Sequence, residues 1–523
     1  MRSTWGTDAA RAAVLGLALV NAVLFSMLLP LWEGFDEPFH YGYVEELWQT
    51  KELPVFRRTV LPFDVVASFQ LAPVSSVARR AIPEAIPYDA WFALPDAERE
   101  RRRRGLEQLT PDPRPPVRGN YEAHQPPLAY LLLAPLDRAL ARFPLTARVL
   151  ALRLVCAVGA VLLMFWGASW LCRELEVPPP YATAALFGIF SSEMFYATTA
   201  HVANDWLAVG LSAFFFASLA RFVRMPHRRS ALVAAAWLSA GLLTKAYFLV
   251  LAIAGAAVAI ARLWRKRTQI AAVLPAMLLV LVLAGPWYGR NLRLYGNAAG
   301  NPEALDGIGL RQSLAAASHI DWPAMAGYLA RASLWTGNNW FNSYSRITLD
   351  ALLALLAIAV ACWVWRRREV RPAEWAVFAT IVAFMGALAY EACSMVADRP
   401  GQAVAGPSPW YTQVLAAPVM ALAFLGLSRW KRAGQVFATV TVALEAWILV
   451  ASWTLKLFPM YAGGPAILRG REIWDWWTHG MTRQSHVLSL TALAPDAWLY
   501  FGLAAALAFT IAACGLTMRA LRR

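Results

Sequence analysis

Apolar segments of about 20 residues recur along the whole chain and are separated by short clusters of arginine and lysine. A helix of about 20 apolar residues crosses the roughly 30 Å hydrocarbon core of a bilayer. Hydrophobic residues make up 59% of the 523 positions and charged residues only 15%, which is too little charge to cover so much apolar surface in water. The chain is therefore predicted to be an all-α integral membrane protein.

The net charge of +15 does not indicate nucleic-acid binding, because most basic residues lie in clusters between apolar segments. Clusters of this kind orient membrane helices, with the basic turns facing the cytoplasm. The predominance of arginine over lysine indicates a GC-rich bacterial genome, and thus the inner (cytoplasmic) membrane of a bacterium. The five cysteines are scattered and predict neither a disulfide nor a thiolate metal site.

Segment length and charge together predict about twelve transmembrane helices with both termini in the cytoplasm. The first seven spans are expected at roughly 11–32, 147–171, 179–199, 206–222, a pair of spans that turns at Thr244-Lys245, and 270–288. The first span is predicted to be an uncleaved anchor. Residues 126–143 are too short and polar to cross alone, and are expected to form an interfacial or half-inserted helix.

The connections on the outer side are predicted to be long. They are expected at 33–125, at roughly 290–345, near 393–410 and at 456–495. Inner clusters such as Arg265, Lys266 and Arg267 support this orientation. The aromatic segments 335–341 and 474–477 in these loops either pack at the interface or help to select an acceptor.

Unusual polar residues from separate connections all fall at the outer membrane face in this topology. They are Asp36, Glu37, His124, Gln125, His201, Asn204, Asp205, Lys245, Arg290 and Asn291. Ionisable residues at this depth are costly and by default line a cavity or a substrate path. Their convergence on one face predicts a functional site on the outer side.

The acid pair Asp36-Glu37 stands just ahead of Pro38 and of a helix predicted by the spacing of Phe39 and Tyr43. Asp36 either caps this helix or acts chemically. A cap does not need the second acid, Glu37. Two acids at the membrane surface could orient an acceptor hydroxyl and take its proton.

The other motifs each have a structural alternative. His124-Gln125 precede two prolines that start a helix, and Asn204-Asp205 stand where they would cap the fourth span. Lys245 either snorkels to the interface or neutralises an anion. Arg290 follows an aromatic pair, so that it either anchors the helix or grips a phosphate with its guanidinium fork.

These motifs, taken in order, resemble those of the GT-C superfamily of membrane glycosyltransferases. The protein O-mannosyltransferases and the enzymes that transfer aminoarabinose to lipid A are the most similar groups. Asp36-Glu37 is similar to the acidic pair of the first outer loop, and Asn204-Asp205 to the acid of the second. His124-Gln125-Pro126-Pro127-Leu128 resembles the Pro-Pro-Leu motif, and the segment 286–291 resembles the Pro-Trp segment whose arginine holds the lipid phosphate.

The resemblance covers roughly residues 10–300 and departs from each group in one respect. Gln125 stands where the aminoarabinose enzymes carry lysine, and the large soluble insert of the mannosyltransferases is absent. The resemblance implies a GT-C-like bundle with juxtamembrane helices, a catalytic module at 1–300 and a variable C-terminal module at 301–523. Substrates are not transferred from either group.

The resemblance implies an inverting glycosyltransferase that uses a polyprenyl-phosphate sugar on the periplasmic side. Its implied catalytic residues are Asp36 as base, Glu37 and Asp205. Its implied phosphate-binding residues are Arg290, Lys245 and His124. Residues implied to position the substrates are His40, Tyr41, Tyr121, Gln125, Asn204 and Asn291.

No cofactor is expected, and a divalent metal is not favoured because the acids form no dedicated cage. The partners expected are the lipid-linked donor, membrane lipid, and an acceptor that is a glycan, a lipid or a protein. Two other functions stay open at this stage. One is a transporter or flippase for a lipid-linked glycan, and the other is a glycan ligase or polymerase that would not need Asp36.

Overall fold

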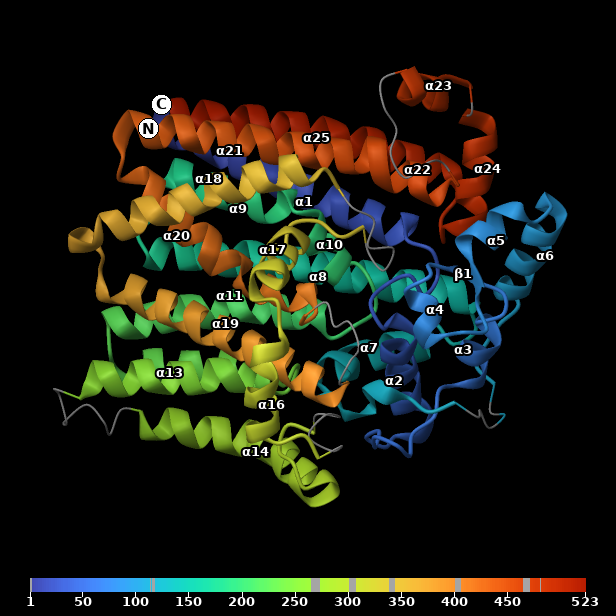
Figure 1. Ribbon diagram of the computed structural model, residues 1–523, viewed down its shortest axis with the longest axis horizontal. Helices are drawn as coiled ribbons and strands as arrows, with labels where there is room; N and C mark the ends of the chain where they lie inside the picture. Colours follow the sequence, from blue (N-terminus) through green and yellow to red (C-terminus); the bar gives the residue numbers. More distant parts are fainter. Residues whose placement is uncertain are drawn as a thin grey trace.

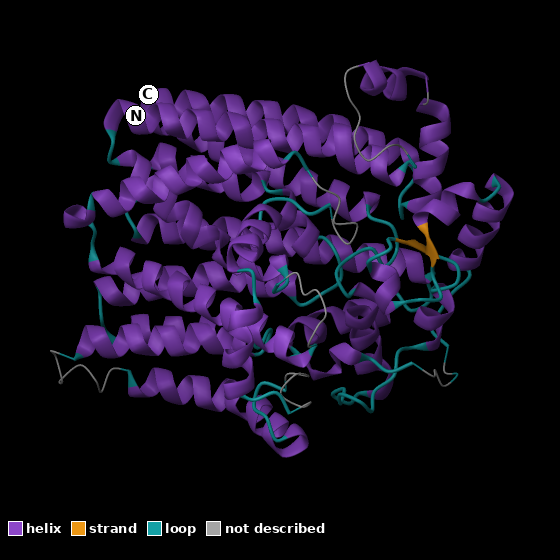
Figure 2. Ribbon diagram, in the orientation of Figure 1, coloured by secondary structure: helices purple, strands orange, loops and turns teal. Residues whose placement is uncertain are grey.

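The computed structural model describes residues 2–112, 114, 118–264, 273–300, 307–337, 344–399, 406–463, 471–479 and 481–523. The predicted inner cluster at 265–267 and part of the aromatic segment, 338–341, lie outside the described residues. Helices dominate the described chain, and its two short strands pair in parallel (Figure 2). The all-α class is therefore confirmed.

The long first outer loop folds into short elements that follow helix α1 (Arg2–Leu28). They are α2 (Glu37–Thr50), α3 (Phe63–Ser68), β1 (Pro73–Val74), α4 (Ala78–Ala81), β2 (Ile86–Pro87), α5 (Tyr88–Ala93), α6 (Asp96–Glu107), η1 (Tyr121–His124) and α7 (Leu128–Ala139). Helix α2 begins where the spacing of Phe39 and Tyr43 predicts it. Helix α7 has 12 residues, too few to cross a bilayer, as expected for residues 126–143.

The rest of the chain forms the long helices and their connections. Up to residue 300 they are α8 (Leu145–Glu174), α9 (Pro179–Ser191), α10 (Glu193–Thr199), α11 (Asp205–Arg224), α12 (Arg228–Leu242), α13 (Phe248–Leu263) and α14 (Leu274–Tyr295). Beyond it they are α16 (Leu310–Ala316), η3 (Ala317–His319), α17 (Trp322–Ala332), α18 (Arg346–Trp365), η5 (Arg367–Glu369), α19 (Pro372–Asp398), η6 (Pro409–Leu415), α20 (Ala416–Ser428), α21 (Lys431–Ser452), η7 (Trp453–Leu457), α22 (Phe458–Tyr461), α23 (Arg471–His479), α24 (Met481–Thr491) and α25 (Asp496–Arg522).

Eight helical segments of the described chain are long and apolar enough to cross a membrane. They are α1, α8, α11, α18, α19, η6 with α20, α21 with η7 and α22, and α25. Helices α9, α13 and α14 run alongside them in the same bundle (Figure 1). The multi-pass membrane architecture is therefore confirmed, and the number of about twelve spans stays a prediction.

The two chain termini lie together at one end of the bundle (Figure 1). The elements of the first outer loop, α2 to α6, gather at the opposite end, together with α23 and α24 (Figure 1). The described parts of two segments predicted to be outer, 33–125 and 456–495, thus share one end of the molecule (Figure 1). That this end faces the periplasm stays a prediction.

Helix α14 runs further than the sequence predicts. It continues past Trp287 through Arg290 and Asn291, and ends only at Tyr295. Gly296 follows with φ of 69°, and its N–H donates to the carbonyl of Leu292 at 3.0 Å. This left-handed cap is a common helix end that glycine adopts without strain. The outer loop expected from residue 290 therefore begins later, because glycine and not the aromatic pair ends the helix.

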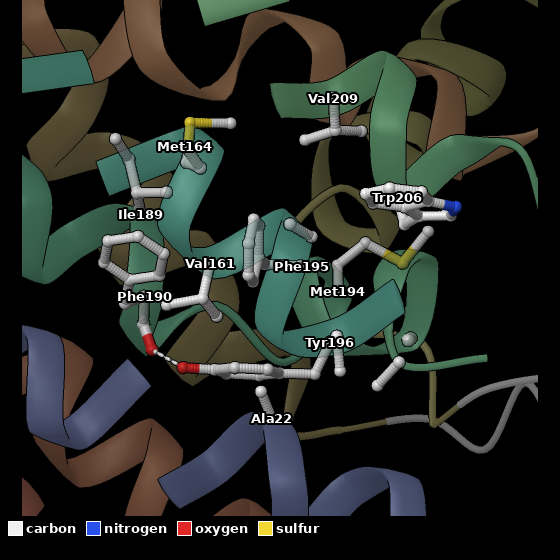
Figure 3. Close-up of a cluster of buried hydrophobic side chains, with 14 of the residues drawn as sticks. Ala22, Val161, Met164, Ile189, Phe190, Met194, Phe195, Tyr196, Trp206 and Val209 are labelled. Carbon is white, nitrogen blue, oxygen red and sulfur yellow. Dashed lines mark hydrogen bonds between the residues drawn. The ribbon is translucent and has the colours of Figure 1, made fainter. Parts of the chain in front are cut away.

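The third predicted span, 179–199, is broken at Ser192 into α9 and α10. A break frees backbone groups that need new partners inside a membrane protein. The hydroxyl of Tyr196 donates to the carbonyl of Phe190 at 2.7 Å, within a cluster of buried side chains (Figure 3). On the other side of the break, the N–H of Met194 donates to the carbonyl of Leu334 at 3.3 Å. The break thus provides the backbone N–H that binds the segment after α17.

Candidate active site

Three connections that are far apart in sequence are tied together by hydrogen bonds. The N–H of Leu128, at the start of α7, donates to the carbonyl of Leu243 at 2.8 Å. The amide nitrogen of Asn204 donates to the carbonyl of Thr244 and to Oε1 of Gln125, both at 3.1 Å. The predicted motifs around 124, 204 and 245 therefore form one structure.

Asp36 stands at the start of α2 with φ of 54°, a left-handed conformation that is strained for a residue with a side chain. Its carboxylate makes no capping hydrogen bond to the helix. Instead, Oδ1 accepts a hydrogen bond from the hydroxyl of Tyr121 in η1. Asp36 therefore occupies the cap position, while its side chain is turned to η1.

Burial raises the pKa of the Asp36 carboxyl above its usual range. The Tyr121 hydroxyl and the positive charge of Lys245 oppose this rise, and the negative charge of Asp205 adds to it. A carboxylate in this setting is a stronger base than one in water.

Lys245 and Asp205 pair with each other. The Nζ atom of Lys245 lies 2.6 Å from both carboxylate oxygens of Asp205, and both side chains are buried. Asp205 begins α11 and Asn204 precedes it without a side-chain cap, so that the capping alternative for Asp205 does not describe this structure. The predicted phosphate-binding lysine is thus already neutralised by a predicted catalytic acid.

Glu37 points away from Asp36 although the two are neighbours in sequence. Its Oε1 accepts from Nε of Arg153 at 2.7 Å and from the N–H of Val202 at 3.0 Å. Both partners of this ion pair are fully buried. Burial opposes the charge of Glu37, but Arg153 outweighs it and lowers the pKa of the carboxyl. The geometry joins Glu37 to α8 and not to the site around Asp36.

His124 and His40 are both turned inward. Nδ1 of His124 lies 2.7 Å from the carbonyl oxygen of Tyr121, and Nδ1 of His40 lies 2.7 Å from the hydroxyl of Tyr130. Burial lowers the pKa of His124 to about 4, and the Tyr121 carbonyl opposes this. His124 is therefore neutral near pH 7, and its single N–H, at Nδ1, donates to the Tyr121 carbonyl, so that Nε2 is left as an acceptor that faces the Gln125 amide at 3.3 Å.

Tyr41 belongs to a second group of charged residues, called here the Arg148 cluster (Arg148, Glu45, Asp64 and Asp137). All four side chains are buried. The Tyr41 hydroxyl donates to Oδ1 of Asp137 at 3.0 Å. The predicted positioning residue Tyr41 therefore faces this cluster and not Asp36.

Arg290 and Asn291 lie on the last turns of α14. One guanidinium nitrogen of Arg290 donates to the carbonyl of Pro54 at 2.7 Å, and the group lies 4.9 Å from the centre of the Trp287 ring. The amide of Asn291 donates to the carbonyl of Ala298 at 3.1 Å. Arg290 therefore contacts the segment after α2, whereas Asn291 contacts the segment directly after α14. Within the described chain, Nη1 of Arg290 is buried without a hydrogen-bond partner.

The C-terminal part of the chain also reaches the site, through η6. Trp410 stacks on Phe35 with ring centres 4.2 Å apart, and the ring of Tyr411 lies 5.1 Å from Nζ of Lys245. Sequence reasoning missed both residues, because nothing in the motif order links residue 410 to residue 36. An aromatic pair at a membrane interface is too common to single them out.

Two more buried residues were not assigned a role from the sequence. Glu122 is 7% exposed, and its Oε2 has no hydrogen-bond partner among the described residues. His201 is 1% exposed, and both of its ring nitrogens lack a partner in the same part of the chain. Glu122 stands two residues before the His124-Gln125 motif, so that its position was the available signal. We call Asp36, Glu122, Asp205 and Lys245 the Asp36 cluster.

An apolar cavity of about 1230 Å³ lies between α18, α19 and α20, with α9 and α17 completing its wall. Leu356 and Val360 of α18 and Leu388 of α19 line it. Thr412 and Gln413 of η6 line it as well, and η6 also carries Trp410 and Tyr411. The cavity and the Asp36 cluster therefore share one structural element.

Among the described residues, no three His, Cys, Asp or Glu side chains are arranged to hold a metal ion. The prediction that no metal is needed stays a prediction.

Several solved structures are similar to this chain at low sequence identity. ArnT from Cupriavidus metallidurans bound to undecaprenyl phosphate is 14% identical, with a TM-score of 0.49 over 99% of this chain and 78% of that chain. EmbB, an arabinosyltransferase from Mycobacterium smegmatis, is 14% identical, with a TM-score of 0.44 over 96% of this chain and 41% of that chain. The oligosaccharyltransferase of Archaeoglobus fulgidus is 13% identical, with a TM-score of 0.39 over 63% of this chain and 43% of that chain.

No curated protein sequence matches the chain significantly. Residues 124–389 match glycosyltransferase family 87, and they include three of the predicted motifs, at 124, 204 and 290. The match covers more than half of the chain and confirms the predicted class. The chain belongs to glycosyltransferase family 87.

Proposed function

We propose that the protein transfers a sugar from a polyprenyl-phosphate donor to an acceptor hydroxyl, with inversion, at the periplasmic face of the inner membrane. The observation that carries this proposal is the setting of Asp36. Its carboxylate is buried next to the Tyr121 hydroxyl, has a raised pKa, and has no direct ion pair among the described contacts. This is the setting of a general base.

In the proposed reaction, Asp36 takes the proton of the acceptor hydroxyl as its oxygen attacks the anomeric carbon. The bond from that carbon to the phosphate oxygen breaks, and the electron pair leaves with the phosphate. A lipid phosphate leaves as an anion, so that one base suffices and no acid has to protonate the leaving group. A single displacement of this kind inverts the anomeric centre.

The leaving phosphate needs positive or hydrogen-bond-donating groups where its charge grows. Arg290 has a buried, unpartnered Nη1 in the described chain, and Lys245 stands beside Asp36 in the Asp36 cluster. His124, whose one N–H is donated to the Tyr121 carbonyl, is proposed to orient Gln125 through Nε2. Gln125, Asn204 and Asn291 are proposed to hold the substrates, and Glu37 to hold the turn before α2 through Arg153.

The hydrocarbon chain of the donor is proposed to lie in the apolar cavity between α18, α19 and α20. Helix η6 lines this cavity and reaches the Asp36 cluster, so that a lipid in the cavity would have its head near Lys245. The acceptor is proposed to enter from the outer loops, where the polar side chains gather.

The test is transfer of a labelled sugar by the purified, reconstituted protein from synthetic polyprenyl-phosphate pentoses and hexoses to a membrane lipid and glycan extract. We expect the Asp36→Asn variant to lose transfer while it keeps its melting temperature. Asp89→Asn, the same change at an exposed position of α5, is the control and should keep full activity.

Full transfer by Asp36→Asn would refute the proposed base and favour a ligase or polymerase. Movement of an intact lipid-linked glycan across the vesicle membrane, without any sugar transfer, would favour a flippase. The anomeric configuration of the product tests inversion separately.

A further inference from the structure

Glu122 is held firmly at the edge of the site. Its N–H donates to the side-chain oxygen of Asn120 at 3.0 Å, and Asn120 in turn donates to the carbonyl of Phe39 at 2.9 Å. The neighbouring Tyr121 hydroxyl binds Asp36 in the turn before α2. The backbone of η1 is thus fixed against the segment that carries the proposed base.

The carboxyl of Glu122 is buried, and Oε2 meets no hydrogen-bond partner among the described residues. A buried polar atom without a partner costs free energy, and such atoms are rare in native proteins. An oxygen left open beside the base therefore points to a group that is absent from the protein itself, namely the substrate.

The charges of the Asp36 cluster do not balance. Lys245 gives both of its short contacts to Asp205. Asp36 and Glu122 then remain as two carboxyl groups that act on each other in a buried site, and ionising both would place like charges close together. The Tyr121 hydroxyl favours the ionised form of Asp36. Glu122 is therefore the member of the pair that keeps a proton.

We propose that Glu122 acts as a protonated carboxylic acid that donates a hydrogen bond to the phosphate of the lipid-linked donor. The acid keeps this proton throughout the reaction, while Asp36 takes the proton of the acceptor hydroxyl. An ionised Glu122 would instead repel the incoming phosphate. This inference rests on the proposed function, and it adds a catalytic residue that touches the donor.

The surroundings of Glu122 support the protonated state. Burial, together with the charge of Asp36, raises the pKa of Glu122 to about 8, although Lys245 and a hydrogen bond from the Gln125 side chain both lower it. Six titratable or charged groups interact with this carboxyl, and they come from different elements of the fold. They are Asp36, Tyr121, Tyr130, Asp205, Lys245 and Tyr411.

The test uses binding of undecaprenyl phosphate to the full-length protein in detergent, as a function of pH and without any acceptor. Above pH 7 the second ionisation of a phosphate monoester is nearly complete, so that the charge of the probe changes little. We expect the affinity of the wild type to fall about tenfold between pH 7 and pH 9, because an acid with a pKa near 8 loses its proton in this range.

The variant Glu122→Gln keeps a neutral hydrogen-bond donor of the same shape. We expect its affinity to change less than twofold over this pH range. Glu46→Gln is the matched control, because Glu46 is a half-buried acid of α2 whose pKa burial also raises. The Glu46→Gln variant should lose affinity between pH 7 and pH 9 as the wild type does.

A fall in affinity between pH 7 and pH 9 that persists in Glu122→Gln would overturn the inference, as would pH-independent binding by the wild type. If Glu122→Gln does not elute as a single species in gel filtration, Glu122→Asp serves instead. The pH at which the affinity of this variant falls must then differ from that of the wild type. These outcomes are separate from the proposed function. A protein that binds the lipid phosphate with the expected pH dependence but transfers no sugar would refute the function and not the proton on Glu122.

Discussion

Two acid-rich clusters, each with one cation and three carboxyl groups, lie at the same end of the bundle and differ in how the cation is shared. In the Arg148 cluster, Arg148 donates to Asp137 at 2.6 Å, to Glu45 at 2.8 Å and to Asp64 at 3.2 Å. In the Asp36 cluster, Lys245 is matched by Asp205 alone. We call the first cluster closed, because each of its carboxylates accepts a hydrogen bond from Arg148. We call the second cluster open, because Oε2 of Glu122 has no hydrogen-bond partner among the described residues.

The neighbouring residues Asp36 and Glu37 show the same contrast between a carboxylate that is paired with a cation and one that is not. Glu37 is closed by Arg153 and by a backbone N–H, whereas Asp36 receives the Tyr121 hydroxyl. Buried charges that are fully paired hold segments in place, and removing one partner is strongly destabilising. Buried polar groups without hydrogen-bond partners are costly, and they are kept where a substrate supplies the missing partner. The comparison predicts losses of stability in the closed groups and losses of activity in the open one.

The largest effect is expected from breaking a closed pair. Arg153→Met leaves Glu37 ionised and buried without a cation, and should cost about 3–5 kcal/mol of unfolding free energy. Unfolding of the purified protein in detergent measures this loss. Because Glu37→Gln removes the orphaned charge, the double variant should regain part of the stability. The rest stays lost, because the buried carbonyls of Leu29 and Pro30 no longer receive the Arg153 guanidinium. A single variant as stable as the wild type would show that the pair is not closed.

Lys245→Met is expected to act mainly on the reaction. The change leaves Asp205 unpaired beside Asp36 and Glu122, so that the site becomes more negative and repels the donor phosphate. Loss of one stabilising group at a growing negative charge typically lowers turnover by about 10²–10³-fold. Rates and donor KM of the reconstituted protein measure the effect. A normal donor KM with normal turnover would remove Lys245 from the site.

Tyr121→Phe removes the hydroxyl that binds Asp36 and should lower turnover by about tenfold, the worth of one hydrogen bond to a charged group. This bond lowers the pKa of Asp36, and its loss therefore raises that pKa. The proposed base must be ionised, so that the acid limb of the pH–rate profile should move to higher pH. An unmoved acid limb would assign that limb to another group.

Tyr41→Phe is the counterpart of Tyr121→Phe in the closed cluster, and the smallest effect is expected from it. It removes one hydrogen bond to Asp137, which still accepts from Arg148 and from Trp48 at 2.7 Å. Stability should fall by about 1 kcal/mol, with the pH–rate profile unchanged. A shifted profile would mean that the two clusters are coupled.

Much of the architecture follows from local pattern. Apolar length predicts where the long helices run, and the spacing of Phe39 and Tyr43 predicts α2. The motifs around residues 124, 204 and 245 converge as expected, because the predicted topology places each of them on the outer side of the membrane. Boundaries were less predictable. Helix α14 ends at a glycine beyond Arg290, and α9 breaks at Ser192, where a distant carbonyl supplies the new partner.

The residues within the site also divide into those that local sequence predicts and those that depend on distant contacts. The sequence nominates Asp36 and Glu37 together, since both are acids beside a proline at the membrane surface. It cannot say which of the two meets Arg153, because that cation is more than 100 positions away on α8. Trp410, Tyr411 and the open carboxyl of Glu122 were missed for the same reason.

The sequence by itself thus determined a multi-pass helical membrane protein and the end of the bundle where its chemistry gathers. Hydrophobic length and charge are properties of contiguous segments, and the bilayer acts on each segment separately. Only the tertiary structure decided which carboxyl groups are closed by a cation and which stay open. Pairing and burial depend on contacts between segments far apart in the chain, and they set the cost and the reactivity of each charge.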